Sequence, residues 1–189
     1  MARTSVQKIS DVLIILCILA LIAEMLLLPW INALAYFQSA VSKDMTFDRL
    51  ISIFVYDFDD GLGNLFRISL DSLRHPPAAV LSLFLWIVAI CAALILVQGI
   101  RILASVADGS PFSAKNASFL RRAGLACFII SAGALARTVF TLCWEGSCAL
   151  TSYTVLFVPL FAMAGLLCLV FSALFRQAAE MKAENDLTI

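Results

Sequence analysis

The sequence predicts an all-α integral membrane protein, a bundle of four membrane-spanning helices with an amphipathic helix on its outer face. Of its 189 residues, 62% are hydrophobic and 14% are charged, whereas soluble domains have about 45–50% apolar and about 25% charged residues. Four apolar segments each reach the length of about 20 residues that a helix needs to cross the hydrocarbon core. They are residues 12–35, 78–100, 123–142 and 154–175. The whole chain is expected to form one membrane domain.

The connecting segments predict the orientation of the chain. Residues 1–11, 101–122 and 176–189 hold eight Lys and Arg residues, whereas the segments 36–77 and 143–153 hold four. Lys and Arg are enriched in the cytoplasmic loops of membrane proteins. We therefore expect both termini, the loop 101–122 and the tail 176–189 to be cytoplasmic, and the other two loops to lie outside.

The first span has a second interpretation. Residues 33–35 read Ala-Leu-Ala, which is the small-residue pattern of a signal-peptidase site after a basic start and an apolar run. The apolar run exceeds the 7–15 residues that are typical of a signal peptide, and it contains Glu24. We therefore expect a retained span.

The first outer loop, residues 36–77, has apolar residues at helical spacing between residues 47 and 66, with acidic residues and Arg between them. This pattern predicts an amphipathic helix that lies on the outer leaflet or caps the bundle.

Glu24 and Arg137 are charged residues inside the predicted spans. Counted from the inner ends of their spans, both are expected roughly 20 Å from the inner face. An unpaired charge in a bilayer is costly, so we expect a structural ion pair that fixes the helix register. The alternatives are an Arg137 that reaches outward to the interface, and a gate, proton site or ligand clamp in a small-solute or proton transporter or channel subunit.

Two of the six cysteines, Cys143 and Cys148, flank four residues of the second outer loop. Outside the cytoplasm disulfides persist, and the glycine between them allows a tight turn, so we expect a disulfide here. Free thiols or a redox-sensing pair are the alternatives. The other four cysteines lie within spans, where they are expected to act as small apolar residues.

The sequence gives no support for catalysis. It has a single histidine, His75, and no nucleotide-binding or hydrolase signature. We therefore expect no enzymatic activity, no metal site and no cofactor. The formal net charge of zero also gives no reason to expect direct nucleic-acid binding.

The third span is rich in small residues, which allow helices to approach closely. This composition predicts tight packing within the bundle or a homo-oligomer. The residues are Gly124, Ala126, Cys127, Ser131, Gly133 and Ala134.

The cytoplasmic loop and tail also have local signals. Gly109 and Pro111 predict a turn, and Ser113 is a favourable N-cap for a helix that continues into the third span. The tail is expected to extend the fourth span as a helix in which Arg176 and Glu180 pair at i,i+4.

These two segments carry a resemblance to a bacterial membrane family known as domain of unknown function 2975. Its members have a cytoplasmic Gly-x-Pro-Phe-Ser-x-x-Asn segment followed by Leu-Arg-Arg-x-Gly, and they tend to end in an acidic-Asp-Leu-Thr-Ile tail. The matching residues here are Gly109, Pro111, Phe112, Ser113, Asn116, Leu120, Arg121, Arg122, Gly124, Glu184, Asp186, Leu187, Thr188 and Ile189.

The resemblance implies a four-span protein of the bacterial inner membrane. It also implies a partner, because genes of this family are often neighbours of a small helix-turn-helix transcription regulator. Under this hypothesis the protein is a regulatory or scaffold protein that contacts the regulator on its cytoplasmic face. The contact residues would be Gly109, Pro111, Phe112, Ser113, Asn116, Arg121, Arg122, Asp186, Leu187, Thr188 and Ile189.

Overall fold

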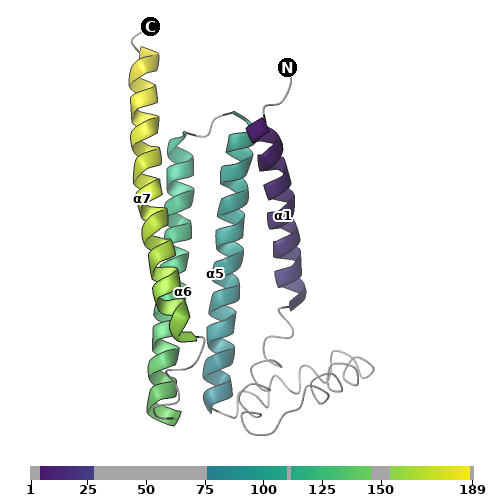
Figure 1. Ribbon diagram of the computed structural model, residues 1–189, viewed down its shortest axis with the longest axis vertical. Helices are drawn as coiled ribbons and strands as arrows, with labels where there is room; N and C mark the ends of the chain where they lie inside the picture. Colours follow the sequence, from purple (N-terminus) through teal and green to yellow (C-terminus); the bar gives the residue numbers. More distant parts are fainter. Residues whose placement is uncertain (1–4, 28–75, 110–111, 146–153, 188–189) are drawn as a thin grey trace.

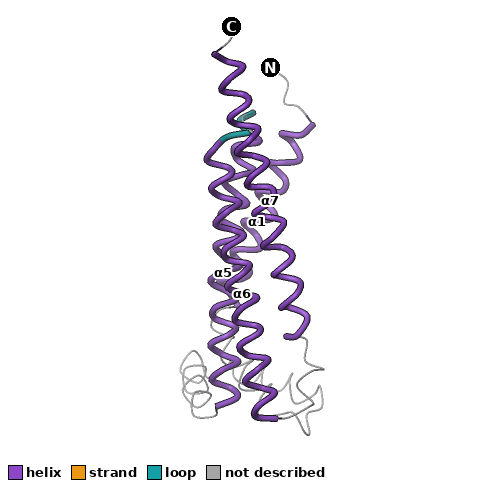
Figure 2. Tube along the Cα trace, turned by 90° about the vertical axis from the view of Figure 1, so that its left-hand side faces the viewer, coloured by secondary structure: helices purple, strands orange, loops and turns teal. Residues whose placement is uncertain are grey.

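The protein is a bundle of four long helices. In the computed structural model, residues 5–27, 76–109, 112–145 and 154–187 are described. The described residues form the helices α1 (Ser5–Leu27), α5 (Pro76–Ala107), α6 (Ala114–Glu145) and α7 (Thr154–Leu187), with no strand among them (Figures 1 and 2). Each of the four is long and apolar enough to cross a membrane. The predicted all-α, multi-pass membrane architecture is confirmed.

Three of the helices are longer than the apolar runs that predict them. α5 and α6 have 32 residues each and α7 has 34, which corresponds to about 48–51 Å. The hydrocarbon core is about 30 Å thick. Hydropathy identifies only the lipid-embedded part of each helix, and the polar residues that follow continue the same helix.

The amphipathic helix that is predicted between residues 47 and 66 of the first outer loop lies outside the described residues.

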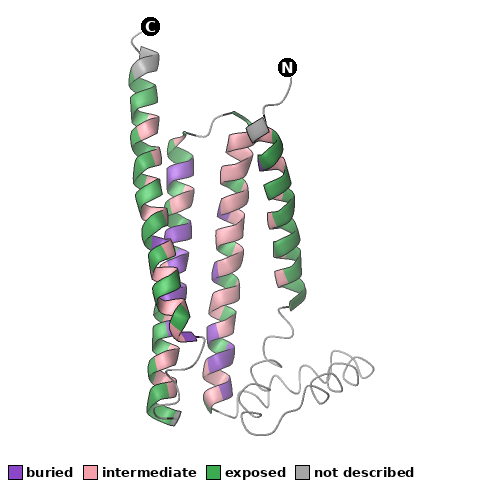
Figure 3. Cartoon of the chain, viewed as in Figure 1, coloured by how far each residue is buried: buried purple, intermediate pink, exposed green. Residues whose placement is uncertain are grey.

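The core lies between α5, α6 and α7. One cluster is formed by Leu81 and Phe84 of α5 and Ala134 of α6, against which Phe157 and Val158 of α7 pack. A second cluster lies farther along the same helices and is centred on Ile130, which is fully buried. Figure 3 shows the buried positions concentrated on α5 and α6. Among the described helices, α1 has its extensive contacts with α5 alone, so it lies at the side of this three-helix core.

α6 and α7 approach closely at two glycines. A Cβ atom added to Gly124 would lie 3.1 Å from the Cβ of Cys168 and 3.1 Å from the carbonyl oxygen of Gly165. A Cβ atom added to Gly165 would lie 3.1 Å from the ring of Phe128. The missing side chains therefore let the two backbones pack together, and the tight packing predicted from the small residues is confirmed within the chain.

The start of α1 and the end of α7 lie at the same end of the bundle. The end of α5 and the start of α6 also lie there, whereas the end of α6 and the start of α5 lie at the opposite end (Figure 1). We call the end of the bundle that contains the start of α1, the end of α7 and the α5–α6 connection the terminal end. The described residues that carry the family resemblance belong to the α5–α6 connection or to the helices α6 and α7.

Candidate functional site

The α5–α6 connection at the terminal end is a tight turn. α5 ends at Ala107, and the N–H of Gly109 donates a hydrogen bond to the carbonyl of Val106 at 3.0 Å. Gly109 has a φ of 76°, a backbone conformation that favours glycine over residues with a side chain. The turn predicted at Gly109 is confirmed, and Pro111 lies outside the described residues.

Ser113 caps the start of α6, as predicted. Its side-chain oxygen accepts a hydrogen bond from the N–H of Asn116 at 3.3 Å. The side chain of Asn116 points inward, is only 1% exposed, and donates through Nδ2 to Oγ of Ser105 at 2.9 Å. Asn116 thus ties the first turn of α6 to the end of α5. In this structure it supports the turn and offers no contact area to a partner.

α1 is attached to the same turn by two polar side chains. Gln7 donates through Nε2 to the carbonyl of Ala107 at 3.0 Å, and Ser10 donates through Oγ to the carbonyl of Leu103 at 2.6 Å. The carbonyls of the last helical turn lack partners within their own helix, and Gln7 satisfies one of them. The sequence analysis missed both contacts. Their only signal was a pair of polar residues three positions apart at the start of an apolar helix.

α7 packs on the other side of the turn. Ser172 donates through Oγ to the carbonyl of Ala117 at 2.7 Å, and the rings of Phe112 and Phe175 lie 5.6 Å apart, measured between their centroids. Phe175 is therefore level with the start of α6. The rest of α7, residues 176–187, extends beyond the turn (Figure 1). Twelve helical residues correspond to about 18 Å. We call this segment the projecting helix.

The projecting helix is largely exposed. Arg176 and Glu180 form the predicted i,i+4 ion pair, with Nε and Oε1 2.9 Å apart, and the side chains of residues 180–184 are all exposed. Asp186 and Leu187 lie in its last turn, and Thr188 and Ile189 lie outside the described residues.

The remaining residues named as contacts are exposed on α6 or on the turn. Arg121 and Arg122 follow the first two turns of α6, and both are exposed. Phe112 is 53% exposed although it contacts Phe175. The terminal end thus combines a framework made by the half-buried Ser113 and the buried Asn116 with exposed side chains that a partner could reach.

Arg137 lies near the opposite end of the bundle. Its Nη1 donates a hydrogen bond to Oγ1 of Thr154, the first residue of α7. Its guanidinium also lies 5.5 Å from the centre of the Phe84 ring on α5, which is within the range of a cation–π interaction. Arg137 therefore links α6 to both of its neighbours.

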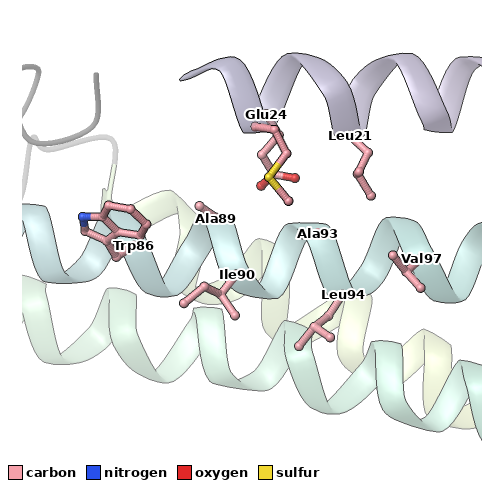
Figure 4. A pocket seen from close by; sticks show the side chains of 9 residues that line it. Leu21, Glu24, Trp86, Ala89, Ile90, Ala93, Leu94 and Val97 are labelled. Atoms are coloured by element: carbon pink, nitrogen blue, oxygen red, sulfur yellow. The ribbon is translucent and has the colours of Figure 1, made fainter. Parts of the chain in front are cut away.

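Glu24 lies in a different environment, between α1 and α5. It lines a pocket of about 370 Å³ whose other walls come from Leu21 and Met25 of α1 and from one face of α5 between Trp86 and Val97 (Figure 4). Its Oε2 atom is buried and accepts no hydrogen bond from the described residues. The expected ion pair with Arg137 is not formed in the structure, because Phe84 and Thr154 hold Arg137 between α5, α6 and α7, away from the α1 side of α5.

The predicted disulfide is not seen either. Cys143 is an exposed free cysteine at the end of α6, and Cys148 lies outside the described residues. The described residues also contain no group of three or more His, Cys, Asp or Glu side chains that could hold a metal ion.

The comparisons with known proteins agree with the resemblance in the motifs. The chain matches no curated protein and no solved structure. Residues 69–189 match the family model described as "Protein of unknown function (DUF2975)". The matched range contains all of α5, α6 and α7 and both motifs, and it leaves out α1. The chain therefore belongs to the DUF2975 family.

Proposed function

We propose that this protein is a non-enzymatic regulatory or scaffold protein of the bacterial inner membrane that docks a soluble cytoplasmic partner at its terminal end. The observation that carries the proposal is the projecting helix. It extends about 18 Å beyond the level of the α5–α6 turn, and its side chains from residue 180 to residue 184 are exposed. A helix that continues past its bundle with exposed faces is suited to contact another protein.

The charge distribution supports a cytoplasmic position for this end. Exposed basic side chains gather on its helices, including Lys115, Arg121 and Arg122 on α6 and Arg176 on α7. Basic residues next to the ends of membrane spans favour the cytoplasmic side. A soluble regulator would reach the projecting helix there without crossing the bilayer.

The charges along the projecting helix favour a basic partner. Beyond the Arg176–Glu180 pair, the sequence carries Lys182 and then Glu184 and Asp186. A DNA-binding regulator presents a basic surface to DNA. An acidic helix end that binds this surface would hold the regulator at the membrane and compete with DNA, which agrees with the helix-turn-helix partner that the family resemblance implies.

The motif residues that form the turn have a supporting role in this proposal. Gly109, Ser113 and Asn116 form the turn against which Phe112 contacts Phe175. They set the position from which α7 leaves the bundle. The partner itself would contact the exposed residues.

A transporter or channel function has less support. Glu24 faces a pocket with otherwise apolar walls, and Arg137 is engaged by Thr154 and Phe84. Within the described residues the two charges lie on different sides of α5. They therefore do not form the shared site that this alternative needs.

Co-purification tests the proposal. The full chain, with an affinity tag at its N-terminus, is co-expressed with a small helix-turn-helix regulator of the kind that the family resemblance implies, and is isolated in mild detergent. We expect the regulator to co-purify with the full chain. A chain that ends at residue 175 should retain less than about one tenth as much regulator, because a loss of about 1.4 kcal/mol in binding free energy raises the Kd tenfold.

A variant in the predicted first outer loop serves as the control. Lys43→Ala with Arg49→Ala changes two basic residues in the segment after α1, and this variant should retain the regulator. Full retention of the regulator by the chain that ends at residue 175 would refute docking on the projecting helix.

A further inference from the structure

The pocket between α1 and α5 combines apolar walls with one carboxyl group. Leu21 and Met25 line it from α1, and Ala89, Ile90, Ala93, Leu94 and Val97 line it from α5 together with Trp86. Its volume of about 370 Å³ lies within the range of small-molecule sites, about 300–1,000 Å³. Figure 4 shows Glu24 pointing from α1 toward α5 on the pocket side.

Glu24 lacks a partner among the described residues. Its Oε2 atom is buried and accepts no hydrogen bond from them, and Arg137 is engaged by Thr154 and Phe84. A carboxyl group within a membrane span is costly unless it is paired. The carboxyl group of Glu24 therefore needs a hydrogen-bond donor, and a cationic donor would also balance the negative charge of the carboxylate.

We propose that this pocket binds a lipophilic amine from the bilayer, with Glu24 as the counter-ion of its ammonium group and the apolar walls around its hydrocarbon part. The position of the pocket favours a molecule dissolved in the membrane over a phospholipid headgroup. Ala89, which lines the pocket beside Glu24, is 13 residues from the start of α5, or about 20 Å along the helix. Headgroup amines lie at the interface, near the helix ends.

The attachment of α1 leaves room for such a ligand. Gln7 and Ser10 bind α1 to α5 at the terminal end, and α1 leans away from α5 toward its other end, where Glu24 is located (Figure 1). The site is independent of the projecting helix and does not depend on the proposed docking function.

Trp86 provides a direct reporter for this site. The full chain with Trp30→Phe and Trp144→Phe keeps Trp86 as its only tryptophan. It is reconstituted in phosphatidylcholine vesicles and titrated with a long-chain primary amine that carries a terminal bromine, which quenches tryptophan on contact. The uncharged probe is the methyl ester of the carboxylic acid with the same bromine-labelled chain.

We expect saturable quenching by the amine at concentrations at least about tenfold below those needed for the ester, because hydrogen bonds to charged groups contribute about 1.5–3 kcal/mol. Glu24→Gln should remove this difference between the probes. Glu180→Gln, a matched change in the projecting helix, should leave it intact. Ala93→Phe, which fills the pocket, should weaken quenching by both probes.

Three results in the phosphatidylcholine vesicles would overturn the proposal. One is equal quenching by the two probes, and another is an amine preference that persists in Glu24→Gln. The third is the absence of quenching by either probe, which would mean that another part of the chain or a second copy covers the pocket.

A final experiment uses vesicles that contain phosphatidylethanolamine. Loss of amine quenching there would identify a headgroup as the occupant and would also contradict the proposal.

Discussion

At the scale of single residues, Arg137 shows how contacts with a hydroxyl group and an aromatic ring help to stabilise a charge inside a span. Its guanidinium bonds to Thr154, which is 1% exposed, and lies over the ring of Phe84. Both contacts reach across to other helices. The residue therefore acts as a link between α5, α6 and α7.

Replacing Arg137 should weaken this link. Arg137→Met keeps a long side chain but removes the donor to Thr154 and the cation over Phe84, and we expect a loss of about 1–2 kcal/mol in the free energy of unfolding. Thermal unfolding of the purified protein in mild detergent measures the change. Glu24→Gln serves as the comparison, because Glu24 does not bond to Arg137, and an equal effect of both changes would contradict the separate environments described above.

The cap of α6 gives a second residue-scale prediction. Ser113→Ala should lower stability by about 0.5–2 kcal/mol because the N–H of Asn116 loses its side-chain acceptor and keeps only the carbonyl of residue 113. Asn116→Ala should cost about 0.5–1.5 kcal/mol because the hydrogen bond from the buried Asn116 side chain to the half-buried Oγ of Ser105 is lost. Lys115→Ala, an exposed neighbour, is the control. Unfolding temperatures of both variants equal to that of the control would refute the structural role of this turn.

At the scale of helices, the contact between α6 and α7 depends on the absence of side chains. Gly124 faces Gly165 and Cys168 at distances that leave a Cβ atom little room. Gly99 on α5 lies in the middle of a helix as well, but a Cβ added there meets nothing within 4 Å. The two glycines therefore provide a matched comparison.

Gly99→Ala and Gly124→Ala should have opposite effects. Alanine in a helix interior is favoured over glycine by roughly 0.5–1 kcal/mol, so Gly99→Ala should leave stability unchanged or increase it. Gly124→Ala should decrease it, because α6 and α7 must separate by a few tenths of an ångström. Unfolding in detergent distinguishes the two. A stabilised Gly124→Ala variant would be incompatible with the close helix contact.

The features that could be predicted from sequence at these two scales are the local ones. The cap at Ser113 and the pair formed by Arg176 and Glu180 depend on residues three or four positions apart, so helical periodicity is enough to predict them. The four spans followed from composition in the same way. The helical continuations of the third and fourth spans were also predicted, from the cap at Ser113 and from the tail, whereas α5 ends seven residues beyond its predicted span because the residues after the apolar run continue the same helix.

The contacts between helices were the part that sequence did not reveal. Counting from the inner ends of the spans placed Glu24 and Arg137 at similar heights, although α1 begins at Ser5 and α6 at Ala114, seven and nine residues before the predicted spans. Height along a helix also says nothing about which side of a neighbour a residue faces. The contacts of Gln7 and Ser10 with α5 were missed for the same reason, since they depend on where another helix ends.

At the scale of the whole molecule, the start of α1, the end of α7 and the α5–α6 turn share one end, and the proposed function requires this end to face the cytoplasm. The structure fixes which segments lie together, and the distribution of Lys and Arg predicts the side. The opposite orientation would place the projecting helix beyond the reach of any cytoplasmic regulator.

Labelling with a membrane-impermeant thiol reagent tests this orientation. One variant keeps Cys143 as its only cysteine, and a second carries Asp108→Cys in a cysteine-free chain. We expect the reagent to label position 143 in intact cells, and position 108 only after the membrane is permeabilised. The reverse pattern would place the terminal end outside and would exclude the proposed docking function.

The central claim is tested most directly by the affinity of the purified regulator for the full chain in lipid nanodiscs, where both faces are accessible. The comparison is with a chain that ends at residue 175 and with Glu184→Lys combined with Asp186→Lys. We predict that each change raises the Kd of the regulator at least about tenfold. Asp108→Lys, a charge reversal at the same end but outside the projecting helix, should leave it unchanged. An unaltered Kd in the truncated chain would contradict the account.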